Sequence, residues 1–186
     1  MQKMLLLDDE PHVLAALRRV LRLHLGAALR VESTTDAQLA LRRAKDTAFD
    51  VVMSDFRMPE MSGIEFLTQV RALQPHGVRM MLSASSDFDT VMRAVNDAGV
   101  FRYLSKPWAE DELVSQVTQA LALAEQSRTD RELADAMRVQ RGDLGAADAE
   151  RRRLEALEPG ITHVEWGPNG EVLMPSMELP SGFGRH

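Results

Sequence analysis

The chain has 186 residues, 45% of them hydrophobic, which suits one domain of ordinary size with an appended segment. It contains no cysteine, and this excludes disulfide bonds and thiolate metal ligands. The sequence has no apolar run of membrane-spanning length and no basic leader followed by an apolar stretch. We therefore expect a soluble, cytoplasmic protein without a membrane partner.

The net charge of −6 is spread unevenly along the chain. Residues 1–108 carry 14 Lys and Arg against 13 Asp and Glu, whereas residues 109–186 carry 8 against 15. A protein that binds the phosphate backbone of a nucleic acid needs a basic face. The charge of the second part therefore disfavours a nucleic-acid partner.

Short apolar runs alternate with segments of helical periodicity through the first 108 residues. This alternation is typical of βα units around a parallel sheet. The predicted strands are 3–7, 29–33, 50–54, 78–83 and 101–104. The predicted helices are 11–25, 36–45, 63–73, 88–97 with Gly99 as a stop, and a last helix that starts near Trp108. The sequence thus predicts an α/β fold in which strands and helices alternate.

The last helix extends past the usual edge of such a domain, near residue 124. Helix-favouring residues continue to about Gln140, and after a break at Gly142 and Gly145 they resume over 146–157. We expect residues 125–158 to form a helical extension, either an intramolecular hairpin or a short coiled coil.

The residues after the extension have a different composition. The pair Asn169-Gly170 lies between two apolar runs and predicts a small β-hairpin over 159–174. Residues 175–186 are rich in Pro, Ser and Gly and are expected to be disordered.

Acidic side chains follow the first and third predicted strands. Asp8-Asp9-Glu10 follows the first strand and Asp55 follows the third, while Ser83 ends the fourth and Lys106 follows the fifth. Ligands bind parallel sheets at the carboxyl ends of the strands, so we expect these groups to share one shallow pocket.

Carboxylates, a hydroxyl and an ammonium group suit a hard cation together with a phosphoryl group. Mg²⁺ prefers oxygen ligands and is typically held by one or two carboxylates, phosphate oxygens and water. An Asp carboxylate beside such an ion is a nucleophile toward phosphorus, as in aspartyl-phosphate enzymes. We assign that role to Asp55, with Lys106 and Ser83 contacting the phosphoryl oxygens.

Four stretches of the chain resemble the receiver domain of bacterial response regulators. They are MLLLDDEPHVLAAL, FDVVMSDFRMPEMSGIEFL, MMLSAS and YLSKPW, and the resemblance covers residues 1–124. It implies a doubly wound, flavodoxin-like sheet of five parallel strands in the order 2-1-3-4-5. The receiver is similar to those that precede cyclic-diguanylate enzymes, yet the residues that follow are too few for such a catalytic domain.

The resemblance also implies a role for each matching residue. Asp9 matches a direct Mg²⁺ ligand, Asp8 a ligand acting mostly through water, and Arg57 the position whose main-chain carbonyl coordinates the ion. Asp55 matches the phosphoacceptor and Lys106 the lysine before a cis-prolyl bond. Ser83 and Tyr103 match the switch pair that moves upon phosphorylation.

The resemblance further implies that the phosphoryl donor is a histidine kinase or a phosphotransfer protein. We expect signalling through changed protein contacts, including a homodimer through the fourth helix, fifth strand, fifth helix and the extension. Beyond its own phosphorylation and dephosphorylation, no enzyme activity is expected.

Two alternatives remain open. One is a transcriptional regulator with an unrecognised DNA-binding output. The other is a phosphatase similar to the haloacid dehalogenases, which also use an Asp nucleophile with Mg²⁺. Those enzymes carry Asp-x-Asp after the first strand, whereas Asp-Asp-Glu follows the first strand here.

Overall fold

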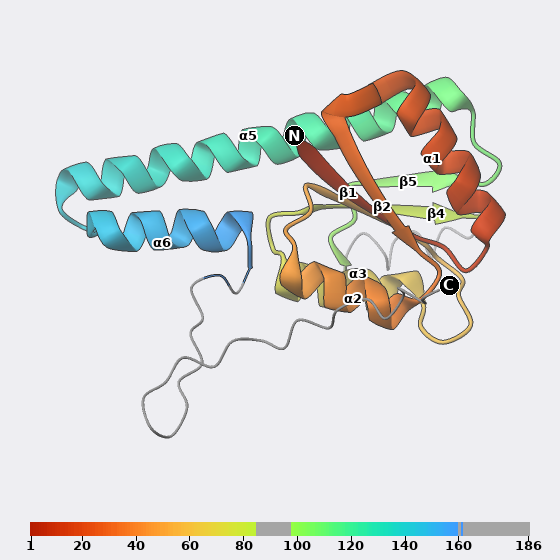
Figure 1. The fold of residues 1–186 in the computed structure, drawn as a ribbon, viewed down its shortest axis with the longest axis horizontal. Coiled ribbons are helices and arrows are strands. Elements are labelled where there is room, and N and C mark those ends of the chain that lie inside the picture. Colours follow the sequence, from red (N-terminus) through yellow and green to blue (C-terminus); the bar gives the residue numbers. More distant parts are fainter. Residues whose placement is uncertain (85–97, 160, 162–186) are drawn as a thin grey trace, which may run out of the picture.

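The computed structural model describes residues 1–84, 98–159 and 161 (Figure 1). The elements in chain order are β1 (Gln2–Leu7), α1 (Pro11–Leu25), the 3-10 turn η1 (Gly26–Ala28), β2 (Leu29–Thr34), α2 (Ala37–Asp46), β3 (Val51–Asp55), α3 (Gly63–Leu73), β4 (Val78–Ser83), β5 (Arg102–Ser105), α5 (Glu110–Arg141) and α6 (Ala146–Leu157). None of the described helices is long and apolar enough to cross a membrane.

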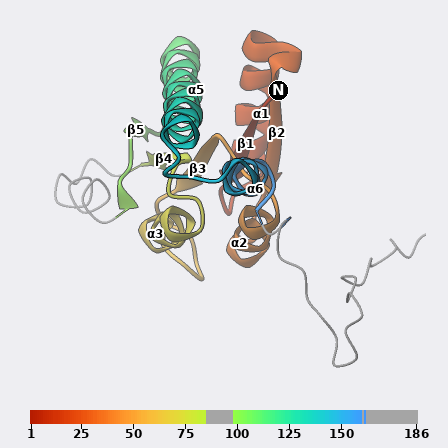
Figure 2. The same ribbon diagram turned by 90° about the vertical axis from the view of Figure 1, so that its left-hand side faces the viewer.

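The five strands form one parallel sheet in the order β2-β1-β3-β4-β5, which confirms the predicted fold. Figure 2 shows α1 and α5 on one side of this sheet and α2 and α3 on the other. Parallel strands covered on both faces must be apolar on both faces. This is why the inner strands β1, β3 and β4 are largely apolar runs and not alternating patterns, whereas the edge strands β2 and β5 carry exposed charged residues.

Neighbouring residues of β1 enter opposite halves of the core. Met4 and Leu6 pack with α1 and α5, whereas Leu5 and Leu7 pack with α2 and α3. All four side chains are buried, as expected for a strand whose successive side chains point to opposite faces. β1 therefore contributes to both halves of the core, one on each face of the sheet.

The observed ends of the elements differ slightly from the predicted ones. Asp55 is the last residue of β3 and does not follow it, because it continues the parallel register by pairing with Leu82. The last helix begins at Glu110, two residues after Trp108, with Ala109 as its N-cap.

The hairpin predicted for residues 125–158 is present as the outer part of α5 and α6. Gly142 ends α5 in the left-handed conformation, with φ of 79°, and Gly145 caps α6. Figure 1 shows α5 projecting past the sheet and α6 folding back beside it. We call residues 125–157 the arm.

Three predictions lie outside the described residues. These are the helix over 88–97, the β-hairpin over 159–174 apart from Pro159 and Ile161, and the disordered segment over 175–186.

Candidate functional site

The carboxyl ends of three strands bring the predicted site residues together. Asp8 directly follows β1, Asp55 ends β3, and Lys106 directly follows β5. β1 and β3 are neighbours in the sheet, and Leu7 pairs with Ser54, so the two aspartates lie side by side. The convergence predicted from the strand ends is therefore observed for these three residues.

Lys106 holds the two aspartates in one charged cluster. Its Nζ lies 2.6 Å from Oδ1 of Asp55 and 2.7 Å from Oδ2 of Asp8, and Oε1 of Glu10 is 3.7 Å away. Asp8 is 0% exposed and Asp55 is 5% exposed. Buried charges are tolerated when they are paired and hydrogen-bonded, which makes the ammonium group necessary for both carboxylates.

The loop after β3 fixes the second oxygen of the Asp55 carboxylate. The backbone amide of Arg57 donates a hydrogen bond to Oδ2 at 2.7 Å, while Lys106 contacts Oδ1. The loop closes where the amide of Gly63 donates to the carbonyl of Phe56 at 2.9 Å. Both carboxylate oxygens of Asp55 are thus held in place.

Gly63 is required at this position for a steric reason. A Cβ atom built on Gly63 would lie 2.1 Å from the carbonyl oxygen of Asp55 and 3.1 Å from Cα of Phe56. Because both contacts are to backbone, no side-chain movement could relieve the overlap. The start of α3 therefore packs directly against the backbone of the proposed phosphoacceptor.

Burial and pairing act in opposite directions on the charged groups. Burial raises the pKa of Asp8 above its ordinary value, although the hydrogen bond and charge of Lys106 counteract this. For Lys106, burial acts to lower the pKa, but hydrogen bonds and charges from Asp55 and Asp8 outweigh it and raise the pKa. Lys106 is therefore a firmly protonated cation, whereas ionised Asp8 carries a burial penalty.

The chemistry of the donor set fits a divalent cation. The carboxylates of Asp8, Glu10 and Asp55 contact one ammonium group, and Asp9 adjoins Asp8 in the chain. Oδ2 of Asp8 is buried, and apart from the Lys106 ammonium group it has no partner among the described residues. A buried carboxylate oxygen with remaining acceptor capacity is a suitable ligand for a hard cation such as Mg²⁺.

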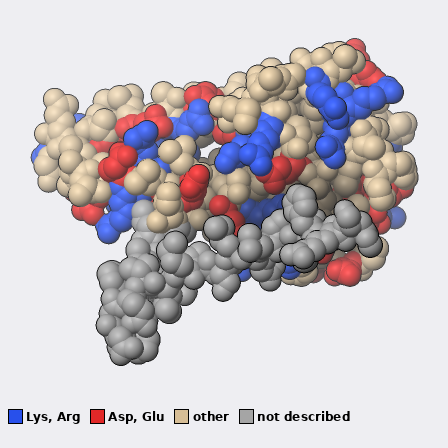
Figure 3. Space-filling view, viewed as in Figure 1, with Lys and Arg blue, Asp and Glu red and all other residues tan. Residues whose placement is uncertain are grey.

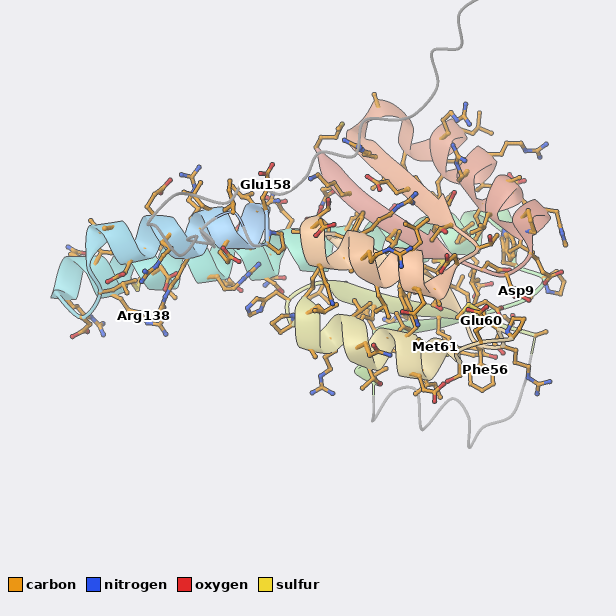
Figure 4. All side chains as sticks on the ribbon, turned by 60° about the horizontal axis from the view of Figure 1, so that its bottom comes forward. Asp9, Phe56, Glu60, Met61, Arg138 and Glu158 are labelled. Atoms are coloured by element: carbon orange, nitrogen blue, oxygen red, sulfur yellow. The ribbon has the colours of Figure 1, made fainter. Side chains whose placement is uncertain are left out.

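Within the described part of the chain, no three carboxylate or imidazole groups form a metal-ligating cluster by themselves. Mg²⁺ is commonly held by only one or two carboxylates, with carbonyl oxygens and waters completing its shell. Figure 4 shows the partly exposed Asp9 at the same end of the molecule as Phe56, Glu60 and Met61 from the loop after β3.

The predicted switch residues occupy β4 and β5. Ser83 is buried at the end of β4, pairs with Ser105 in register, and accepts a hydrogen bond on its carbonyl from the Lys106 amide at 2.9 Å. Tyr103 is half-buried and packs on the side of the core formed with α2 and α3. The peptide bond between Lys106 and Pro107 is cis, as the resemblance implies.

Two residues of the site were not singled out from the sequence. Glu10 approaches Lys106, and its backbone amide donates to Oδ1 of Asp8 at 3.0 Å. The run Asp8-Asp9-Glu10 contained this signal, but only two of its acids were assigned. The contact of Gly63 with Asp55 joins residues from separate elements, and only the folded chain reveals it.

Comparisons with known proteins agree with this geometry. The family model of the response regulator receiver domain matches residues 4–118. The hydrogenase transcriptional regulatory protein HoxA of Bradyrhizobium diazoefficiens is 40% identical over 119 residues, which make up 64% of this chain and 24% of HoxA. The transcriptional regulatory protein ZraR of Klebsiella oxytoca is 31% identical over 188 aligned positions, covering 97% of this chain and 41% of ZraR.

A solved structure described as adenylate cyclase from Rhodopirellula baltica is 30% identical, with a TM-score of 0.65 over 72% of this chain and 96% of that chain. The chain spans less than half of the length of HoxA or ZraR. The similarity to the receiver family, in contrast, extends over more than half of the chain and includes every residue of the cluster around Lys106. The chain therefore belongs to the response regulator family, and residues 4–118 form its receiver domain.

Proposed function

We propose that Asp55 accepts a phosphoryl group from a histidine kinase or a phosphotransfer protein in a Mg²⁺-dependent reaction. The observation that carries this proposal is the convergence of Asp8, Asp55 and Lys106 within ion-pair distance at the carboxyl ends of β1, β3 and β5. A lysine shared by two buried carboxylates is an expensive arrangement for stability alone, which favours a functional role.

Different residues of the site have different roles in the reaction. The oxygens of Asp8, Asp9 and Asp55 and the carbonyl of Arg57 would hold Mg²⁺, which neutralises charge on the phosphoryl oxygens when it is bound. The Arg57 amide and Lys106 orient the Asp55 carboxylate for attack. A carboxylate oxygen forms the new bond to phosphorus while the bond from phosphorus to the donor's nitrogen breaks.

After transfer, Lys106 compensates the added negative charge, and the Ser83 hydroxyl donates a hydrogen bond to a phosphoryl oxygen. Movement of Ser83, and of Tyr103 on the adjacent strand, then changes the surface formed by β5 and α5. The chain acts as a signalling protein and not as a turnover enzyme, because the phosphoryl group remains on its own side chain.

We propose that the output is a change in protein contacts, including homodimerisation. Figure 3 shows Lys and Arg side chains interleaved with Asp and Glu side chains along the visible face of the arm. Several of them form ion pairs within the arm, such as Arg138 with Asp135 and Arg153 with Glu150. A helix whose surface carries charges of both signs lacks the basic face that DNA binding requires, and it favours contacts with other proteins.

Labelling with acetyl phosphate tests the proposed acceptor. Incubation with Mg²⁺ should add one phosphoryl group to Asp55, detected by intact mass and by peptide mapping. The label should disappear in Asp55→Asn and after removal of Mg²⁺ with a chelator. Asp46→Asn, which removes an exposed carboxylate at the end of α2, should be labelled normally. Failure to label the wild type, or labelling of Asp55→Asn to the same extent, would disprove the assignment.

A further inference from the structure

A groove lies between the arm and the amino end of the sheet, which is the end opposite to Asp55. Its volume of about 1140 Å³ exceeds the roughly 300–1,000 Å³ that is usual for small-molecule pockets. The walls include Phe49, Leu73 and Pro75 from the receiver and Ala149, Ala156 and Leu157 from the arm. The size and the apolar lining favour a stretch of polypeptide as the occupant over a small ligand.

Charged side chains of both signs line the groove. Among the described residues, the Lys3 and Arg131 side chains form no ion pair at salt-bridge distance, although the charges of Glu132 and Asp135 act on Arg131. Arg131 donates from Nε only to the carbonyl of Ser127 in its own helix. Burial lowers the pKa of both His76 and Arg131, and the charge of Arg131 lowers the pKa of His76 further. An apolar segment fits these walls, and Lys3 and Arg131 are positioned to pair with carboxylates that it carries.

A segment of that chemistry begins at the wall of the groove itself. Pro159 lines the groove, and residues 162–174 begin after a connection of two residues, Gly160 and Ile161. The apolar residues of this segment are Val164, Trp166, Val172, Leu173 and Met174. Its carboxylates are those of Glu165 and Glu171, and it contains no Lys or Arg.

The sequence predicts a two-stranded hairpin for this segment, and a hairpin of that size is not stable without a surface to pack on. Because a short connection joins it to Pro159, its effective concentration at the groove reaches the millimolar range. A second copy of the chain would have to compete against this tether.

We propose that residues 162–174 dock into this groove and fasten the arm to the amino end of the sheet. The apolar side chains of the segment contact Phe49, Leu73 and the alanines of α6, and its carboxylates approach Lys3 and Arg131. The docked segment is independent of the chemistry at Asp55. It leaves the exposed Leu133, Met137 and Leu154, which do not line the groove, available to other partners.

Tryptophan fluorescence of the full-length chain tests the docking. The chain has two tryptophans, so Trp108→Phe leaves Trp166 as the single reporter. We expect Trp166 to show blue-shifted emission and an acrylamide quenching constant several-fold lower than in the denatured chain. Both values should be independent of protein concentration.

Two pairs of substitutions in the Trp108→Phe background locate the docking surface. Leu73→Glu and Arg131→Glu change the groove and should shift the emission of Trp166 to the red and raise its quenching several-fold. Leu123→Glu and Arg151→Glu are matched controls outside the groove and should leave the emission unchanged. Leu73 and Leu123 are equally exposed, at 38% and 37%, so neither change disrupts the core.

Each remaining outcome overturns the proposal. If the quenching constant of Trp166 equals that in the denatured chain, the segment does not dock. Protection that grows with protein concentration assigns the groove to a second copy. Protection that both groove variants retain places the segment elsewhere on the molecule. Circular dichroism and Asp55 labelling of each variant verify that the receiver is folded in every comparison.

Discussion

Asp8 is a buried carboxylate whose ionised form is stabilised almost entirely by one neighbour. Lys106 lies 2.7 Å from it, and the Glu10 amide supplies a hydrogen bond to its other oxygen. Without the ammonium group, Asp8 and Asp55 would be two negative charges in a buried site. The stability of this receiver should therefore depend on Lys106 as strongly as its chemistry does.

We predict that Lys106→Met lowers the free energy of unfolding by about 3–5 kcal/mol at pH 7, the cost of breaking a buried ion pair. The loss should shrink as the pH falls from 7 toward 4, since protonation of the raised-pKa carboxyl of Asp8 removes its charge. Denaturant titrations at several pH values measure both effects. Lys45→Met, at an exposed position of α2, should change the stability by less than about 0.5 kcal/mol.

In the wild type, the raised pKa of Lys106 determines how the free energy of unfolding changes with pH in the alkaline range. Its ion pairs contribute from neutral pH, where the partner carboxylates are ionised, up to pH 10.5, and they are lost as the pH rises through the raised value. Added Mg²⁺ should stabilise the protein at neutral pH, because it binds the folded site and relieves the penalty on ionised Asp8. An unfolding midpoint that does not respond to Mg²⁺ would contradict the proposed metal site.

Gly63→Ala should lower the free energy of unfolding by about 1–3 kcal/mol, because the added methyl group overlaps the backbone of Asp55. It should also slow labelling of Asp55, since relief of the overlap displaces the acceptor. Gly145→Ala is the matched control. Its nearest contact is a carboxylate oxygen of Asp148 at 3.3 Å, which is able to move away, so its effect should stay below about 0.5 kcal/mol. Equal effects of the two substitutions would contradict the steric argument.

At the scale of single elements, α3 holds the loop of the site through its first turn. Ser62 accepts a hydrogen bond from the Glu65 amide, and the Glu65 carboxylate accepts one from the Ser62 amide. This capping box satisfies two donors that a helix end leaves unpaired. It fixes the point at which Gly63 meets the backbone of Asp55.

Ser62→Ala should lower the free energy of unfolding by about 1 kcal/mol. Hydrogen bonds from Ser62 hold the pKa of Glu65 below its ordinary 4.5, so their contribution is present above pH 4.5 and is lost as the pH falls through the lowered value. The difference between wild type and variant should therefore decrease in acid. Thr68→Ala, in the same helix and exposed, should show no such pH dependence.

At the scale of the whole molecule, the two ends of the sheet carry different features. The acidic cluster lies at the carboxyl ends of the strands, whereas the arm projects beyond the amino ends. The two are joined by α5, which begins just after Lys106 and continues into the arm. The half of α5 near the receiver buries Leu113 and Val117, but α6 has no buried residue. The arm therefore retains apolar surface for another protein.

We predict that beryllofluoride with Mg²⁺ raises the mass measured by light scattering, because the phosphorylated form associates through β5, α5 and the arm. Asp55→Asn should remain unchanged under the same conditions. Leu133→Glu, on the exposed face of the arm, should weaken association without affecting acetyl phosphate labelling. A constant mass in the wild type would assign the output to a different protein partner.

Much of the fold could be predicted because its signals are local. The apolar runs of a parallel sheet, the stop at Gly142 and the helical stretch of α6 each depend on a few adjacent residues. The start of α5 was predicted only to within two residues, because its N-cap, Ala109, makes no side-chain hydrogen bond and so leaves no local signal. The close approach of Gly63 to Asp55 was missed because it joins two elements.

The sequence alone determined the class of fold, the order of its elements and the identity of the acids and the lysine at the strand ends. Only the tertiary structure decided that one ammonium group bridges Asp8 and Asp55, that Glu10 joins them, and that a groove faces the amino ends of the strands. Periodicity along the chain reports which side of an element is buried. Distances between side chains from different strands depend instead on strand order and register, which exist only in the folded sheet.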